Sequence, residues 1–128
     1  GKPFEIIIEN TDFMPHNMVI VRPGTRTKVG EVCETMKPDQ LDSEGRAFVP
    51  ETRDILAATR LLESGQTATL RLTAPSEEGI NEFVCTFPGH WQVMWGQLVV
   101  TKNVDAYLAK NPQAPTLTSD PHAHHAFE

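Results

Sequence analysis

The sequence contains the stretch Cys85-Thr86-Phe87-Pro88-Gly89-His90-Trp91-Gln92-Val93-Met94. A thiol, an imidazole and a thioether follow one another in it at the spacing Cys-x4-His-x3-Met. Pro88 and Gly89 favour a sharp turn, which would bring His90 and Met94 back toward Cys85. The stretch therefore predicts a loop that offers three metal-binding groups to one ion.

A fourth metal-binding group is available at His16, which stands between Pro15 and Asn17 near the start of an expected strand. A trigonal plane of two imidazoles and a thiolate, with a weak axial thioether, is typical of copper sites that transfer electrons, whereas structural zinc takes four firm Cys or His ligands. The residue types therefore predict a single copper ion that cycles between Cu(I) and Cu(II). The predicted metal ligands are His16, Cys85, His90 and Met94.

Two of these residues have alternative interpretations. Cys85 could form a disulfide with Cys33, the other of the two cysteines in the chain. Met94 could simply fill space in the core. For Cys33 itself we expect packing as a small apolar residue on a helix.

Short apolar segments bounded by Gly, Pro and Asn predict a mostly β chain. The predicted strands cover residues 4–9, 18–21, 66–73, 82–85 and 96–101, and residues 78–81 are predicted to form a loop. The segment 18–21 is continuously apolar, which indicates a fully buried strand.

Helical patterns are confined to short segments. Apolar residues recur at helical spacing between residues 27 and 36, which predicts a short helix there. Residues 104–110 favour one or two helical turns with Asn103 as the N-cap. Residues 51–63 are also rich in helix formers and precede Gly65, so local propensity favours a helix there as well.

The length of 128 residues and the 39% of hydrophobic residues fit a single domain. The net charge of −6, with scattered basic residues, argues against a nucleic-acid surface. No apolar run approaches the ~20 residues needed to span a bilayer. We expect a domain over residues 1–102 and a C-terminal extension or linker over residues 103–128, which is rich in proline. For His122, His124 and His125 in this extension we expect only adventitious metal binding.

The stretch 85–90 and the spacing from His90 to Met94 resemble the ligand loop of the blue copper proteins, or cupredoxins, and most closely that of the azurins. Residues 55–66 are similar to the azurin segment that leads into the strand before the copper loop, so the resemblance covers about residues 4–102. It implies an all-β fold, a Greek-key β-sandwich of about eight strands with a short helical flap, followed by an irregular C-terminal tail. It also implies that residues 55–62 are extended rather than helical.

The resemblance further implies a role for each residue of the site. His16, Cys85 and His90 would be equatorial ligands and Met94 the axial ligand of a type 1 copper centre. The backbone N–H groups of Asn17 and Phe87 would donate hydrogen bonds to the Cys85 sulfur. The Asn17 side chain would brace the two ligand segments against each other.

The function that this implies is single-electron transfer without catalysis, either by this domain alone or as the electron port of a larger redox protein. A redox partner protein or domain would dock near His90, with Met14 and Trp91 as an apolar rim. The alternative function is copper delivery or storage. Thiolate and soft-metal chemistry, together with the resemblance, predicts a periplasmic or other extracytoplasmic location.

Overall fold

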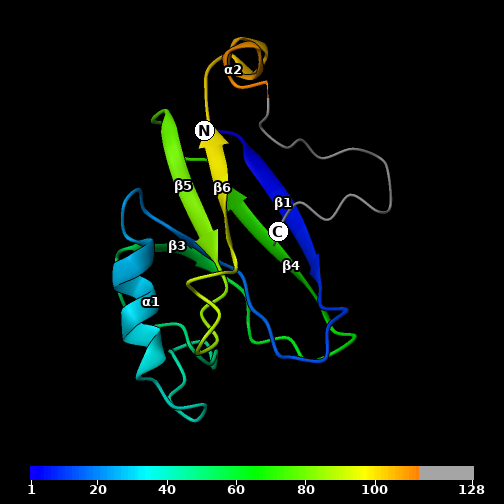
Figure 1. Ribbon diagram of the computed structural model, residues 1–128, viewed down its shortest axis with the longest axis vertical. Coiled ribbons are helices and arrows are strands. Elements are labelled where there is room, and N and C mark those ends of the chain that lie inside the picture. The colour runs from blue at the N-terminus through cyan, green and yellow to red at the C-terminus, as the bar shows by residue number, and fades with distance from the viewer. Residues whose placement is uncertain (113–128) are drawn as a thin grey trace.

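The computed structural model describes residues 1–112 and shows a mostly β domain (Figure 1). Six strands and two helices follow one another along these residues. They are β1 (Pro3–Glu9), β2 (Val19–Val21), α1 (Arg26–Glu34), β3 (Ile55–Ala58), β4 (Thr67–Thr73), β5 (Gly79–Val84), β6 (Trp95–Val100) and α2 (Val104–Lys110).

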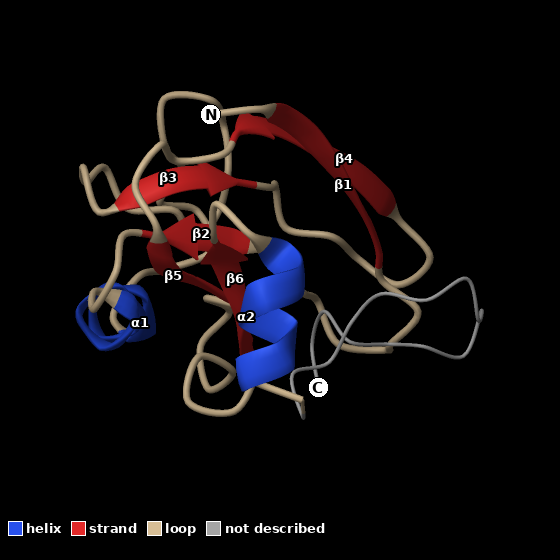
Figure 2. Cartoon of the chain, turned by 90° about the horizontal axis from the view of Figure 1, so that it is seen from above, coloured by secondary structure: helices blue, strands red, loops and turns tan. Residues whose placement is uncertain are grey.

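The strands form two antiparallel sheets. β1 pairs with β4 from Pro3 opposite Thr73 to Glu9 opposite Thr67. The larger sheet has the order β3-β2-β5-β6. Seen from above, the pair of β1 and β4 forms a layer apart from the larger sheet, and α1 lies beside the larger sheet (Figure 2). The predicted all-β class is confirmed, with six strands in the described residues rather than about eight; the Greek-key connection stays a prediction.

β2 is the strand around which the core is built, because both of its faces are covered. Ile20 packs toward β1 and β4 in a cluster with Ile8 and Leu70. Val19 and Val21 pack on the opposite face in a second cluster, with residues of α1. All three residues of β2 are fully buried, as their continuous apolar sequence predicts.

Most predicted elements are confirmed, with ends that differ by a few residues. One prediction is wrong: residues 78–81 were expected to be a loop, but β5 begins at Gly79. Ile80 pairs with Val99 of β6, and the buried Asn81 donates from its side chain to the Val21 carbonyl at 3.2 Å. A neighbouring strand and one buried hydrogen bond thus outweigh the turn-forming composition of this segment.

Local propensity predicts a helix over residues 51–63, whereas the resemblance implies an extended segment over residues 55–62. The structure contains no helix there, and residues 55–58 form the strand β3. β3 pairs with β2 in this segment, with Val19 opposite Ala58. Leu62, at its end, pairs with His16 in an isolated antiparallel bridge. Sheet pairing therefore overrides the helix-forming residues here.

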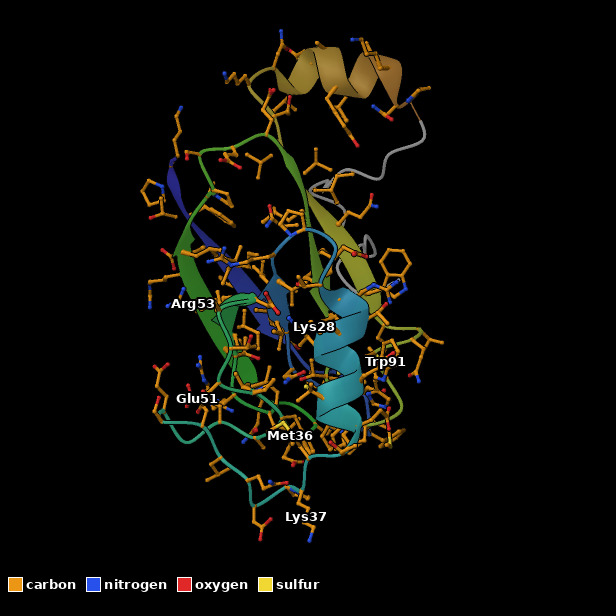
Figure 3. All side chains as sticks on the ribbon, turned by 90° about the vertical axis from the view of Figure 1, so that its left-hand side faces the viewer. Lys28, Met36, Lys37, Glu51, Arg53 and Trp91 are labelled. Carbon is orange, nitrogen blue, oxygen red and sulfur yellow. The ribbon has the colours of Figure 1, made fainter. Side chains whose placement is uncertain are left out.

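The helix α1 packs on the loop that joins β5 to β6. Gly30 faces the indole of Trp91, and a Cβ placed on Gly30 would lie 2.4 Å from the ring. The two elements lie side by side in Figure 3. Arg26 adds a hydrogen bond from Nη1 to the Trp91 carbonyl at 3.2 Å, and its guanidinium lies over the Trp95 ring. Gly30 is therefore the residue that permits this close approach.

We expect Gly30→Ala to destabilise the chain by about 1–2 kcal/mol. Glycine to alanine in a helix interior normally stabilises by up to about 1 kcal/mol. Here the added methyl overlaps the Trp91 ring, and such overpacking costs about 1–3 kcal/mol. Urea unfolding would measure the difference, with Glu31→Ala on the exposed side of α1 as the control. A G30A variant as stable as the wild type would contradict this packing.

The helix α2 lies at the end of the molecule opposite the loop between β5 and β6 (Figure 1). Its predicted N-cap is confirmed, since the Asn103 side chain accepts from the backbone N–H of Ala106 at 3.0 Å. Within the described part of the chain, no helix has the length and apolar character required to cross a membrane. His122, His124 and His125 lie outside the described residues, and the domain boundary at residue 102 stays a prediction.

Candidate metal centre

The position of His16 is set by backbone pairing with Leu62. The His16 N–H donates to the Leu62 carbonyl at 3.0 Å, and the Leu62 N–H donates back at 2.8 Å. Leu62 is itself fully buried in the core cluster of Ile20 and Leu70. The backbone of His16 is therefore held against the buried core by its pairing with Leu62.

The loop from Cys85 to Met94 is folded by two successive turns. The His90 N–H donates to the Phe87 carbonyl at 2.9 Å, and Gly89 has a φ of 88°, the conformation that a Pro-Gly turn of type II requires. The Met94 N–H then donates to the His90 carbonyl at 2.8 Å, which forms one helical turn. The Cys85 N–H donates to the Met94 carbonyl at 2.9 Å and closes the loop.

Three of the predicted ligands meet at one point. The Cys85 sulfur lies 3.7 Å from Nδ1 of His16 and 3.5 Å from Nδ1 of His90. All three donor atoms lie within 4.8 Å of one another. A trigonal site with metal–nitrogen bonds of about 2.0 Å and a metal–sulfur bond of about 2.3 Å separates sulfur from nitrogen by about 3.7 Å. The residues present therefore fit a single copper ion.

The predicted fourth ligand, Met94, is held beside this group through its backbone bonds to His90 and Cys85. Its side chain is half-buried. The axial role of Met94 stays a prediction.

Asn17 joins the two ligand segments, as the resemblance to the cupredoxins implies. Its Nδ2 donates to Oγ1 of Thr86 at 2.8 Å, and its Oδ1 accepts from the Thr86 N–H at 2.8 Å. The Thr86 hydroxyl in turn donates to the Phe48 carbonyl at 2.6 Å. Asn17 and Thr86 are both fully buried, so this network fixes the residues next to His16 and Cys85.

The electrostatic environment favours neutral groups before metal uptake. Burial raises the pKa of the Cys85 thiol, and hydrogen bonds from the backbone N–H groups of Asn17 and Phe87 oppose that rise. These are the two predicted donors to the sulfur. Burial and the nearby His16 lower the pKa of His90. Metal binding to this group must therefore release the thiol proton, whereas His90 is ready to bind as a neutral imidazole.

Two acidic residues contribute to the site without having been predicted from the sequence. Oδ2 of Asp12 lies 2.8 Å from Nε2 of His16. The pKa of Asp12 is lowered, mainly by this hydrogen bond, so the carboxylate accepts and Nε2 carries the proton. Glu34, from α1, accepts the Gly89 N–H at 2.6 Å and holds the ligand loop. The spacing of Asp12 to His16 was visible in the sequence, but nothing there distinguishes it from an ordinary surface carboxylate.

Of the two residues predicted to form an apolar rim near His90, Met14 lies at the surface and Trp91 packs on the core. Met14 is 46% exposed. Two further apolar residues, which were not predicted from the sequence, are also exposed, Phe13 at 95% and Val93 at 73%. Trp91 packs instead against α1 and the core cluster that contains Val29. Phe13 and Val93 could have been found from the sequence, because each is an apolar residue on a loop close to a proposed ligand.

The alternative of a disulfide between Cys33 and Cys85 is wrong, because both cysteines are free. Cys33 is fully buried on α1 in the core cluster, as expected. Burial raises the pKa of its thiol to about 11. Cys33 therefore acts as an apolar packing residue.

Comparisons with known proteins agree with this geometry. Residues 2–101 match the model of the family described as copper binding proteins, plastocyanin/azurin family. The outer membrane protein H.8 of Neisseria meningitidis serogroup B is 29% identical over 106 residues, which cover 77% of this chain and 54% of that protein. The chain thus spans about half the length of the curated relatives it matches.

Two solved structures have a similar fold. An auracyanin from the photosynthetic bacterium Roseiflexus castenholzii superposes with a TM-score of 0.64 at 31% identity, covering 79% of this chain and 78% of that one. Auracyanin A of Chloroflexus aurantiacus, described as a "blue" copper protein, gives a TM-score of 0.68 at 26% identity, covering 79% and 80%. The family match over residues 2–101, together with the convergence of two histidines and a cysteine, shows that the chain belongs to the plastocyanin/azurin family of copper binding proteins.

Proposed function

We propose that this chain transfers single electrons through one type 1 copper centre. The observation that carries the proposal is the convergence of His16, Cys85 and His90, with donor atoms within 4.8 Å of one another. Bound copper would supply a reversible Cu(I)/Cu(II) couple there. We assign His16, Cys85 and His90 as equatorial ligands and Met94 as the axial ligand, a set that both oxidation states accept.

The protein's own contribution is a rigid site. The Asn17–Thr86 network and the Leu62 pairing hold the backbone of the two ligand segments in place before metal is bound. Fixed ligands reduce the rearrangement that a change of oxidation state requires. With four protein ligands around one ion, no position is left for a substrate, which supports a carrier rather than an enzyme.

Electrons would enter and leave through His90. This imidazole is half-buried, whereas His16 and Cys85 are buried. The exposed apolar residues Phe13, Met14 and Val93 lie on the two ligand segments and would form the docking surface for a redox partner protein or domain. Such small apolar surfaces suit transient redox encounters. For this chain we propose a periplasmic location, and the relative named outer membrane protein H.8 supports the coarser assignment to an extracytoplasmic one.

The direct test is optical. The purified chain is loaded with Cu(II), and visible absorption and EPR spectra are recorded before and after reduction and reoxidation. We expect an intense thiolate-to-Cu(II) band that bleaches on reduction and returns on reoxidation. A copper-loaded protein without colour would contradict the proposal.

Kinetics of copper release separate this function from copper delivery. The Cu(I) form is mixed with a Cu(I) chelator, and transfer is followed by absorption. A buried ligand set predicts transfer much slower than seconds, whereas complete transfer within seconds would favour a delivery protein.

A further inference from the structure

The carboxylate of Asp12 contacts the imidazole of the proposed ligand His16 at Nε2, whereas the Cys85 sulfur lies near the other ring nitrogen, Nδ1. Nε2 of His16 donates to Oδ2 of Asp12 at 2.8 Å, and Nδ1 of the same ring faces the Cys85 sulfur at 3.7 Å. The hydrogen bond therefore fixes the tautomer in which Nδ1 is free to bind the metal.

Asp12 is itself held in place by the loop that carries it. Its Oδ1 accepts from the Phe13 N–H at 2.7 Å, and its own N–H donates to Oδ1 of Asn10 at 2.9 Å. Asn10 is buried, and its Nδ2 donates to the Leu62 carbonyl at 2.8 Å. Leu62 is the residue that pairs with His16, so the carboxylate and the imidazole are anchored to the same residue.

The other acidic residue at the site acts differently. Glu34 accepts from the Gly89 backbone and not from a ligand ring. Within residues 1–112, Asp12 is the acidic residue whose carboxylate is bonded to a proposed ligand side chain. A carboxylate in this position makes a metal-bound imidazole a stronger donor.

We propose that Asp12 is a positioning residue that, through His16, stabilises Cu(II) relative to Cu(I) and so lowers the reduction potential of the centre. The inference rests on the proposed copper function. A stronger donor and a nearby negative charge both favour the more highly charged ion. Because the Asp12 side chain is 55% exposed, solvent reduces this effect but does not remove it.

The test compares reduction potentials of the copper-loaded wild type, Asp12→Asn and Asp12→Ala. D12N can keep a hydrogen bond but loses the charge, and D12A loses both. Loss of such a partner typically costs about 10–100-fold in metal affinity. We expect D12A to lose about tenfold in Cu(II) affinity relative to Cu(I), which raises the potential by about 59 mV, with D12N between D12A and the wild type.

The matched control is Glu9→Gln, which makes the same change in net charge just before this loop. Glu9 is exposed, and its side chain forms no hydrogen bond or ion pair in the described part of the chain. We expect E9Q to leave the potential unchanged. Equal shifts in E9Q and D12N would show a general charge effect and overturn the proposal.

A second measurement reports on the hydrogen bond itself. In the diamagnetic Cu(I) form, the Nε2 proton of His16 should exchange with solvent more slowly in the wild type than in D12A by NMR. Equal exchange rates would contradict the bond. If D12A fails to bind copper, the comparison of reduction potentials between D12N and the wild type tests the proposal.

The two proposals fail in different ways. A wild type without the reversible blue band would refute the copper function before any potential is measured. A blue wild type whose potential D12N and D12A leave unchanged would refute only the role of Asp12.

Discussion

Replacement of Cys85 by serine is expected to remove the intense visible band of the Cu(II) protein completely. The band requires charge transfer from a thiolate, and serine offers a harder oxygen ligand in its place. Cys85 is fully buried, and its sulfur is the donor shared by the contacts to His16 and His90. Absorption and EPR spectra of the copper-loaded variant would show Cu(II) without a thiolate ligand.

Cys33 provides the control for this prediction. Cys33→Ala removes a second fully buried thiol that packs on α1 and lies outside the group of three donors. We expect C33A to stay blue and to lose only the stability of a small packing defect, about 1 kcal/mol. A blue C85S variant, or a colourless C33A variant, would show that the thiolate had been assigned to the wrong cysteine.

Truncation of Phe48 to alanine is expected to destabilise the chain by about 3–5 kcal/mol. Phe48 is 2% exposed, and its ring packs edge-on against Phe87 with centroids 5.5 Å apart. Phe87 in turn packs against the His90 ring at 5.1 Å. The substitution would leave a cavity beneath the ligand loop and remove a large part of a typical total stability of about 5–15 kcal/mol.

Urea unfolding of the metal-free protein measures this loss. Phe13→Ala is the matched control, because the same ring is removed from a position that is 95% exposed. We expect F13A to change stability by no more than about 0.5 kcal/mol. Similar losses in the two variants, or a loss below about 1 kcal/mol in F48A, would contradict the packing described for Phe48.

The ligand loop could be predicted from the sequence because its information is local. The spacing of Cys85, His90 and Met94, with Pro88-Gly89 between them, determines both the turn and the donors that it presents. The position of His16 was more difficult to predict. His16 is held near Cys85 by pairing with Leu62, a residue far away in the sequence. Only the family resemblance placed residues 55–62 in an extended conformation.

Other features of the fold and the site depend on contacts between distant residues, which the periodicity of the sequence does not predict. The start of β5 at Gly79 follows from pairing with β6. The position of Trp91 follows from the absence of a side chain at Gly30, on a different element. Asp12 and Glu34 gain their roles from the imidazole and the backbone N–H that they reach in the folded chain.

The link between Asn17 and Thr86 has a consequence for how the chain acquires its metal. These neighbours of two proposed ligands are 69 residues apart in sequence, so a contact between them closes a long loop and costs chain entropy. A nascent or denatured chain has Cys85 near His90 but has no His16 beside them. Copper should therefore bind the native state more tightly than the denatured ensemble, and the difference between the two binding free energies should add to the resistance of the protein to unfolding.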